Sequence, residues 1–176
     1  DSRLKIFTKE NTGLPNSLNF GLSKAHGEWI ARIDADDFSL PCRLTEQMMI
    51  TQKDSNVILV GTNFYIHENG KKIFKSNLPN NRNKLLYRLS NMKGFFPHSS
   101  AFFLRKAALQ VGGYRESFKF AQDHDLWLRL SNIGSIKCTE KHLTIINKHD
   151  QRRSQKHERE VYNYNIAALL FHLDDK

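Results

Sequence analysis

Residues 27–44 read GEWIARIDADDFSLPCRL, and this stretch decides the fold. A largely apolar run, 28–33, predicts a strand, and three carboxylates follow it within four positions: Asp34, Asp36 and Asp37. Like charges this close repel one another, so they are tolerable only in solvent or around a cation. Ligands of open α/β sheets bind at the carboxyl ends of strands, so this acidic cluster lies where a site is expected.

Two interpretations of the acidic cluster are open. Asp34 and Asp36 can both project into the crevice, and two carboxylates with water and phosphate oxygens form the ligand set that Mg²⁺ or Mn²⁺ prefers. Alternatively, the cluster is a solvated turn in which Asp37 or Ser39 caps the following helix. An isolated DxD pattern is too short to decide between them.

The order of elements along the chain predicts a mixed sheet of α/β type. Strands are expected at 4–10, 28–33, 57–66 and 135–149, and helices at 17–27, 40–54, 81–92, 124–134 and 159–173. The dipeptide Asn69-Gly70 indicates a hairpin turn. A strand and a short helix should end at the Gly112-Gly113 pair, and the helix over 40–54 should place Leu44 and Met48 along one face.

Composition and charge restrict the class of protein. The chain has 176 residues, of which 39% are hydrophobic and 26% charged, as in a soluble protein with one domain. Its net charge of +9 implies an anionic partner: nucleic acid, a phosphorylated small molecule or an acidic membrane face. The two cysteines, Cys42 and Cys138, lie far apart, which indicates neither a zinc site nor a disulfide framework and fits a reducing cytosol.

Residues 11–47, NTGLPNSLNFGLSKAHGEWIARIDADDFSLPCRLTEQ, strongly resemble the central segment of family 2 glycosyltransferases with the GT-A fold. The matching residues are Asn11, Gly13, Leu14, Asn19, Gly27, Glu28, Ile30, Asp34 to Asp37, Leu40, Pro41, Arg43 and Leu44. The resemblance implies that Asp34 and Asp36 hold a divalent cation, Mn²⁺ or Mg²⁺, and part of a nucleoside-diphosphate-sugar, with Asp36 as the direct ligand. By the same resemblance, Asn19 is expected among the residues that bind the nucleotide-sugar.

Residues 97–134 resemble the acceptor half of the same family, in which a Gly-Gly-Tyr turn precedes Glu-Asp-x-Asp-Leu-Trp and a helix. Here Gln122 replaces the family's Glu, which leaves the acceptor open. Asp123 falls on the position that acts as general base in inverting members, where a carboxylate accepts the proton of the attacking sugar hydroxyl. The alternative is that Asp123 or Asp125 merely caps the helix, and we assign Asp125 to that role.

Residues 146–154, INKHDQRRS, resemble the family's Tyr-Arg-x-His followed by Ser, with Asn147 where Arg is usual. The resemblance makes His149 a candidate metal or diphosphate contact, and an ordinary surface histidine is the alternative. Three basic residues nearby could neutralise a diphosphate or anionic lipid, or form a solvated basic face: Arg152, Arg153 and Lys156.

The fold expected from this resemblance is α/β, with a GT-A type (nucleotide-diphospho-sugar transferase-like) mixed sheet flanked by helices and N-terminally incomplete. Family members begin with a strand, a helix and a second strand that have no counterpart here, so we expect a fragment of a longer enzyme or another segment in their place. Within one domain, residues 1–45 would be the remaining part of the nucleotide-sugar-binding half, 46–150 the central and acceptor half, and 151–176 a C-terminal helix.

The expected function is transfer of a sugar from a nucleoside-diphosphate-sugar to a hydroxyl of a glycan or lipid-linked acceptor, with inversion and metal dependence. The expected location is cytoplasmic, with possible peripheral contact with the anionic inner face of the membrane, and no nucleic-acid partner is expected. Two alternatives stay open: a metal-dependent nucleotidyltransferase that uses the same aspartates, and a non-catalytic remnant or binding module.

Overall fold

The structure is a computed structural model that describes residues 1–149 and 156–174. The strands of its mixed sheet lie in the order β1-β5-β3-β6-β2. Strand β4 also pairs with β3, along a later part of β3 than the part that pairs with β5. The strands are β1 (Trp29–Ala31), β2 (Phe38–Ser39), β3 (Val57–Glu68), β4 (Lys71–Lys75), β5 (Phe102–Leu104) and β6 (Ser135–Lys148). The expected mixed α/β sheet is therefore confirmed.

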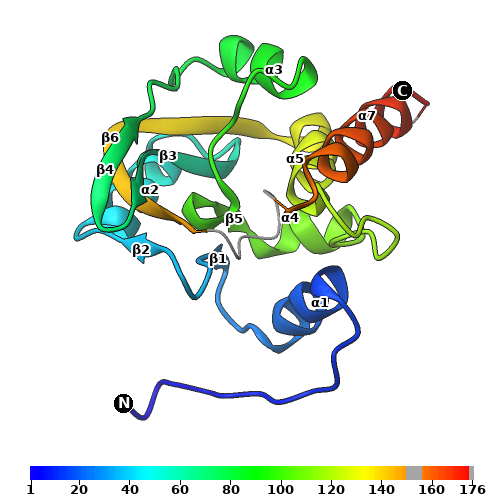
Figure 1. Cartoon of the computed structure of the whole chain (residues 1–176), viewed down its shortest axis with the longest axis horizontal. Helices are drawn as coiled ribbons and strands as arrows, with labels where there is room; N and C mark the ends of the chain where they lie inside the picture. The colour runs from blue at the N-terminus through cyan, green and yellow to red at the C-terminus, as the bar shows by residue number, and fades with distance from the viewer. Residues whose placement is uncertain (150–155, 175–176) are drawn as a thin grey trace.

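Helices surround this sheet and carry much of the core (Figure 1). They are α1 (Leu14–Lys24), α2 (Arg43–Lys53), α3 (Arg82–Ser90), α4 (Arg105–Gln110), α5 (Gln122–Ile133) and α7 (Glu158–Asp174), and a 3₁₀ turn, η1, covers His98–Ser100. Helix α5 lies at the centre, because its buried side chains contact the sheet on one side and α7 packs along it on the other.

Strands β3 and β6 form the long axis of the sheet, and they run parallel from Val57↔Ser135 to Glu68↔Lys148. The first seven residues of β3 are all buried, as a run of β-branched and apolar residues predicts for a central strand. The hairpin expected at Asn69-Gly70 joins β3 to β4, and both turn residues have positive φ, 51° and 75°.

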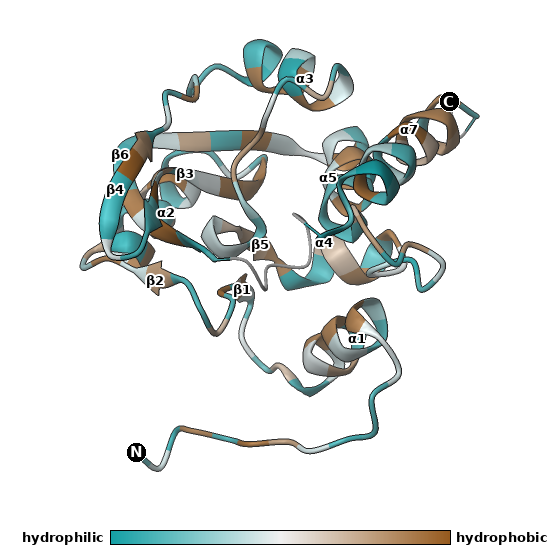
Figure 2. Ribbon diagram, viewed as in Figure 1, coloured by the Kyte–Doolittle hydropathy of each residue, from teal (hydrophilic) through white to brown (hydrophobic). Residues whose placement is uncertain are grey.

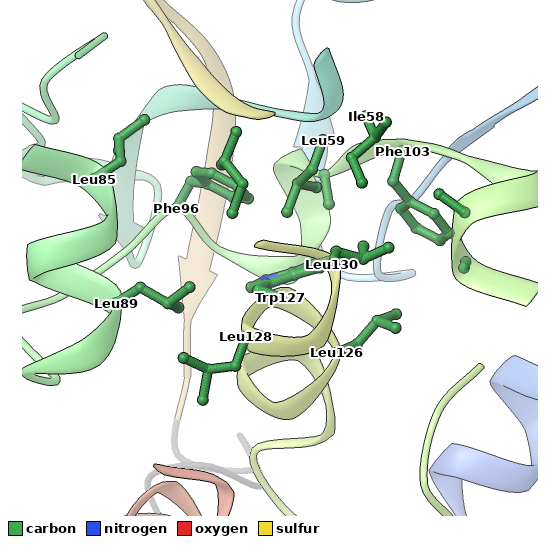
Figure 3. Close-up of a cluster of buried hydrophobic side chains, with 14 of the residues drawn as sticks. Ile58, Leu59, Leu85, Leu89, Phe96, Phe103, Leu126, Trp127, Leu128 and Leu130 are labelled. Atoms are coloured by element: carbon green, nitrogen blue, oxygen red, sulfur yellow. The ribbon is translucent and has the colours of Figure 1, made fainter. Parts of the chain in front are cut away.

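The core lies between the sheet, α3 and α5 (Figure 3). Trp127 is 1% exposed, and its ring lies 5.7 Å from that of Phe103 and 6.1 Å from that of Phe96. Figure 3 shows Leu126, Leu128 and Leu130 on the same helix as Trp127, with Leu85 and Leu89 of the neighbouring helix α3 facing it. This packing fixes the start of α5 relative to the sheet.

The strand expected over residues 4–10 is wrong. These residues have no regular secondary structure, and Figure 1 shows them as an extended trace that leads away from the sheet. Leu4 is 69% exposed and Ile6 82%. Alternation of apolar residues makes a strand only when a neighbouring strand supplies hydrogen bonds, and within the described residues none lies beside this segment.

The buried face of α2 also differs from the expectation. Leu44 is 50% exposed, whereas Arg43, Gln47 and Thr51 are buried one turn apart. Gln47 Nε2 donates to the carbonyls of Val60 and Ser100, each at 2.8 Å, so the polar face is satisfied inside the protein.

Helix α7 packs on α5 and the segment before it through aromatic side chains. The rings of Tyr164 and Phe171 lie 5.8 Å and 6.0 Å from the ring of Phe118. Figure 2 shows apolar residues along the C-terminal half of α7. Within residues 1–149 and 156–174, no helix has the length and hydropathy needed to span a membrane.

Candidate active site

The acidic loop after β1 is held between two distant segments of the chain. Its backbone forms a turn in which Asp37 N–H donates to the Asp34 carbonyl, at 3.2 Å, and Leu40 N–H donates to the Leu143 carbonyl of β6, at 2.9 Å. Strand β2 then pairs with β6 through Phe38↔Ile145 and Ser39↔Thr144. This strand was not predicted, because two residues give no periodic signal. Its pairing places the acidic loop against the carboxyl end of β6.

Asp34 and Asp37 are both engaged by protein groups. Arg32 Nη2 lies 2.5 Å from Asp34 Oδ1, and Ser99 Oγ lies 2.8 Å from Asp34 Oδ2 and 2.5 Å from Asp37 Oδ2. Asn147 N–H donates to Asp37 Oδ1 at 3.0 Å. Burial opposes ionisation of Asp34, but the bonds from Arg32 and Ser99 outweigh it and hold the pKa of Asp34 below its usual range.

The capping interpretation of this loop is wrong. Helix α2 has Cys42 at its N-cap position and no side-chain cap hydrogen bond, so neither Asp37 nor Ser39 caps it. Asp37 instead ties the loop to η1 and β6 and is only 6% exposed.

Asp36 differs from its neighbours because its carboxylate faces outward. The side chain is 43% exposed, and Oδ2 lies 2.9 Å from Nε2 of His149, which is itself 42% exposed. Asn147 Nδ2 donates to the Asp36 carbonyl at 2.6 Å and orients the loop. An outward carboxylate beside an imidazole is a donor pair that suits a divalent cation such as Mn²⁺.

The donor set is incomplete without a ligand. Among the residues that the structure describes, no group of three or more His, Cys, Asp or Glu side chains is arranged to hold a metal ion. Asp36 and His149 supply two donors, and Asp34 already accepts bonds from Arg32 and Ser99. Remaining positions would fall to water and phosphate oxygens, which is the usual arrangement for Mg²⁺ bound with a nucleotide.

Asp123 lies in the first turn of α5 and is half-buried. The helix is entered through Ala121 at φ 52°, and Asp123 Oδ1 accepts the His124 N–H at 2.9 Å. Asp125, two positions later, is 1% exposed and accepts hydrogen bonds from Arg115, at 3.0 Å, and from Arg129. The helix-capping role expected for Asp125 is therefore wrong, because its carboxylate is consumed in a buried ion pair.

One cavity of about 540 Å³ joins these two acidic segments. The predicted site residues that line it are Asp34, Asp36, Asp123 and His149. Residues of α3, α5 and α7 and of the segment between α3 and η1 contribute to the rest of its wall, including Leu89, Phe96, Trp127, Val161 and Asn165. Residues more than 100 positions apart in the sequence thus line the same cavity.

Asn19 does not line this cavity. Its amide clamps the backbone of Tyr114, with Nδ2 donating to the Tyr114 carbonyl at 2.7 Å and Oδ1 accepting the Tyr114 N–H at 2.8 Å. A Cβ on Gly113, which has φ 67°, would lie 2.7 Å from Asn19 Oδ1, so glycine is needed there. This contact positions α1, and the predicted role of Asn19 in nucleotide-sugar binding stays a prediction.

His98 also lines the cavity and pairs with a tyrosine to which the sequence assigned no role. His98 Nε2 and Tyr114 Oη are 2.8 Å apart, and both side chains are buried. Burial lowers the pKa of His98 to about 4, against an opposing influence from Asp123, so the imidazole is neutral at pH 7. Because His98 pairs with Tyr114, while Ser99 bonds to Asp34 and Asp37, these residues form no Ser-His-Asp triad.

The basic segment that follows His149 lies partly outside the described residues. Arg152, Arg153 and Ser154 fall outside the described residues, so the structure does not place them. Lys156 is exposed at the start of the segment that leads into α7.

Comparison with known proteins agrees with this fold and identifies a family. Residues 1–113 match glycosyl transferase family 2. An O-antigen biosynthesis glycosyltransferase of Escherichia coli, WbnJ, is 38% identical over 135 residues, which are 75% of this chain and 51% of the relative. The amylovoran biosynthesis glycosyltransferase AmsE of Erwinia amylovora is 31% identical, over 72% of this chain and 47% of the relative. The chain spans about half the length of these two curated relatives.

Solved structures share the fold at low sequence identity. S. aureus TarS 1–349, in complex with UDP-GlcNAc, matches 92% of this chain with 47% of its own, at a TM-score of 0.70 and 14% identity. The mannosyltransferase PcManGT of Pyrobaculum calidifontis, in complex with GDP-Man and Mn²⁺, matches 96% of this chain with 45% of its own, at a TM-score of 0.60 and 16% identity. The expected glycosyltransferase-type fold is confirmed, and the chain belongs to glycosyl transferase family 2.

Proposed function

We propose that this protein transfers a sugar from a nucleoside-diphosphate-sugar to a hydroxyl of a glycan or lipid-linked glycan. The observation that carries the proposal is that Asp36 with His149, and Asp123 on the opposite segment, line one cavity. One pair of side chains suits a cation-bound diphosphate, and the other carboxylate suits a proton acceptor.

In the proposed reaction, Asp123 accepts the proton of the acceptor hydroxyl as its oxygen attacks the anomeric carbon. The bond from that carbon to the diphosphate oxygen breaks, and nucleoside diphosphate leaves with the bonding electrons, so the configuration is inverted. Asp36 and His149 would hold the divalent cation, with Asp34 at the same loop, and the bound cation would offset charge on the leaving diphosphate.

The donor is proposed from what the fold neighbours bind and from the cavity's chemistry. UDP-GlcNAc and GDP-mannose are bound by TarS and PcManGT, so UDP, GDP and these two sugar nucleotides form a rational probe panel. Because WbnJ and AmsE are named for O-antigen and amylovoran biosynthesis, we propose assembly of a bacterial surface polysaccharide as the biological setting.

The proposed division of labour follows the chain. Residues 1–45 would contribute to the donor side, 46–150 to the centre and the acceptor side, and 151–176 the C-terminal helix. The cavity wall draws on each of these stretches, through Asp36, Asp123 and Val161.

Peripheral contact with an anionic membrane on the cytoplasmic side is part of the proposal, because the net charge of +9 favours such a surface and a lipid-linked acceptor would lie there. Sedimentation with vesicles tests this contact. Binding should be stronger to vesicles with anionic lipid than to neutral ones and should weaken with salt. Equal binding to the two kinds of vesicle would contradict the proposed membrane contact.

The assay for the activity identifies the leaving group. The chain is incubated with Mn²⁺, UDP-GlcNAc or GDP-mannose, and a lipid-linked glycan fraction, and the released phosphates are separated. We expect nucleoside diphosphate from the wild type, none above background from Asp36→Ala, and the wild-type level from Glu116→Ala, an exposed acidic residue outside the cavity wall. Release of pyrophosphate in a parallel incubation with UTP or GTP and a sugar 1-phosphate would instead identify a nucleotidyltransferase.

A further inference from the structure

Arg32 occupies a fixed place in the cavity wall that the proposed reaction does not explain. It follows β1 directly and lines the cavity together with Asp34 and Asp123. Its N–H donates to the Ala101 carbonyl at 2.9 Å, and its own carbonyl accepts Arg43 Nη2 at 2.8 Å. The Arg32 side chain is only 11% exposed, so its guanidinium has little freedom to move into solvent.

The guanidinium of Arg32 is only partly satisfied by the protein. Nη2 pairs with Asp34 Oδ1, whereas Nη1 is buried and has no hydrogen-bond partner within the described residues. A charged donor that is buried without an acceptor opposes folding, so such an atom in a cavity wall indicates an acceptor that arrives with a ligand. Arg88, another basic residue of the same wall, differs because its Nε already donates to the Gly94 carbonyl, at 2.9 Å.

Arg32 shares a cavity with both ends of the proposed reaction. Asp36 and His149, which would hold the cation-bound diphosphate, and Asp123, the proposed base, line the same space of about 540 Å³. Asp34, which pairs with Arg32, lies two positions before Asp36 in the chain. A group bound at Arg32 would therefore lie in the cavity that must also contain the transferred sugar.

The chemistry of the Arg32–Asp34 pair suits a hydroxyl group. The pair is neutral overall and offers both a donor and an acceptor, and a sugar hydroxyl needs both. Resting on the proposed function, we propose that Arg32 and Asp34 together hold a hydroxyl of the transferred sugar, with Arg32 Nη1 as the donor. Arg32 is thus a specificity-determining residue that selects the sugar of the donor.

The test compares each sugar nucleotide with the same nucleotide lacking the sugar. Calorimetry with Mn²⁺ gives the Kd of UDP-GlcNAc relative to UDP, and of GDP-mannose relative to GDP. Arg32→Lys and Arg32→Gln should each raise the ratio of the sugar-nucleotide Kd to the diphosphate Kd, for uridine, guanosine or both, by about tenfold or more. This is the loss expected when a charged hydrogen bond to the sugar is removed. The Kd of the diphosphate itself should change by less than about twofold.

The matched control is Arg159→Gln, which removes an exposed arginine outside the cavity wall. It should keep the wild-type ratio. The proposal is overturned if the Arg32 variants leave both ratios unchanged, if they weaken sugar nucleotide and diphosphate equally, or if Arg159→Gln causes the same loss. Failure of the folded wild type to bind any nucleotide would contradict the proposed function itself, so the two failures are distinguishable.

Discussion

The two acidic segments of the cavity have similar sequences and different support. In the loop after β1, the buried carboxylate of Asp37 accepts hydrogen bonds from Ser99 and from the Asn147 N–H, both within the described residues. In the first turn of α5, the buried carboxylate of Asp125 is held by two arginines, Arg115 and Arg129. In each segment a nearby acid is more exposed and lines the cavity: Asp36 in the loop and Asp123 in the helix.

In each acidic motif, two acids one or two positions apart therefore have different roles. A buried acid with complete hydrogen bonds fixes the backbone, and its neighbour is thereby presented to a ligand at low conformational cost. Since the two kinds of acid differ in burial, substitutions should separate them: one kind should affect activity and the other stability.

The largest effect is expected at Asp123. Asp123→Asn keeps the shape of the side chain but removes the proton acceptor, so kcat should fall about 10²- to 10⁴-fold with the donor Kd nearly unchanged. Single-turnover transfer and calorimetry measure these two quantities. Asp123 is not the base if the variant transfers at the wild-type rate.

The next effect is expected at Asp125. Asp125→Ala leaves Arg129, which is 8% exposed, without its charge partner and should lower the free energy of unfolding by about 3–5 kcal/mol. Urea denaturation followed by circular dichroism measures this loss. The double variant Asp125→Leu with Arg129→Met should be less destabilised than the single variant, because the buried charge of Arg129 is removed together with that of Asp125.

A pH effect is expected from His98, which lines the same cavity as the two acidic segments. Since its folded pKa is about 4, below the unfolded value of 6.5, the unfolded state binds more protons between these values. The free energy of unfolding should therefore fall as the pH drops from about 6.5 to 4, by about 3 kcal/mol at most.

His98→Gln should reduce this loss across the same pH window. The contribution of Asp34, whose pKa is lowered, is present above its unfolded value of 3.8 and disappears only below it, so the two groups act in different windows. A wild type whose stability is constant from pH 6.5 to 4 would show that His98 is not buried as a neutral imidazole.

The smallest effect on stability is expected at Asp36. Because its side chain is 43% exposed, Asp36→Ala should change the free energy of unfolding by less than about 0.5 kcal/mol. Asp37→Ala, at the adjacent buried position, should cost about 1.5–3 kcal/mol through its lost charged hydrogen bonds. Equal losses in the two variants would contradict the division between a structural and a ligand-facing acid.

The sequence predicted the elements whose signals are local. The run of β-branched residues in β3, the Asn69-Gly70 hairpin and the periodic helix containing Trp127 are all confirmed. The prediction of a strand over 4–10 was wrong because a strand needs a neighbouring strand to pair with, and the segment's own pattern carries no information about that neighbour. The predicted buried face of α2 was wrong because Arg43 and Gln47 are polar residues of a kind usually found at the surface. The distant carbonyls that accept their hydrogen bonds cannot be read from the sequence of the helix.

The sequence predicted the acidic residues of the cavity but not the residues that hold them in place. Asp34, Asp36, Asp123 and His149 could be proposed from a family resemblance, and the fold brings all four to one cavity. Ser99 and Asn147 are 65 and 110 residues away from the aspartates that they bond, and no short-range pattern joins them. Asn147 was visible only as a departure from the family's usual arginine.

The central claim is that the outward carboxylate of Asp36 and the cavity behind it bind a cation with a nucleoside diphosphate. The most direct measurement is calorimetric titration of the chain with UDP and GDP, with and without Mn²⁺, in the wild type and in Asp36→Ala. We expect binding that requires Mn²⁺ in the wild type and disappears in the folded variant. Metal-independent binding that is equal in both proteins, or no binding by the folded wild type, would contradict the account.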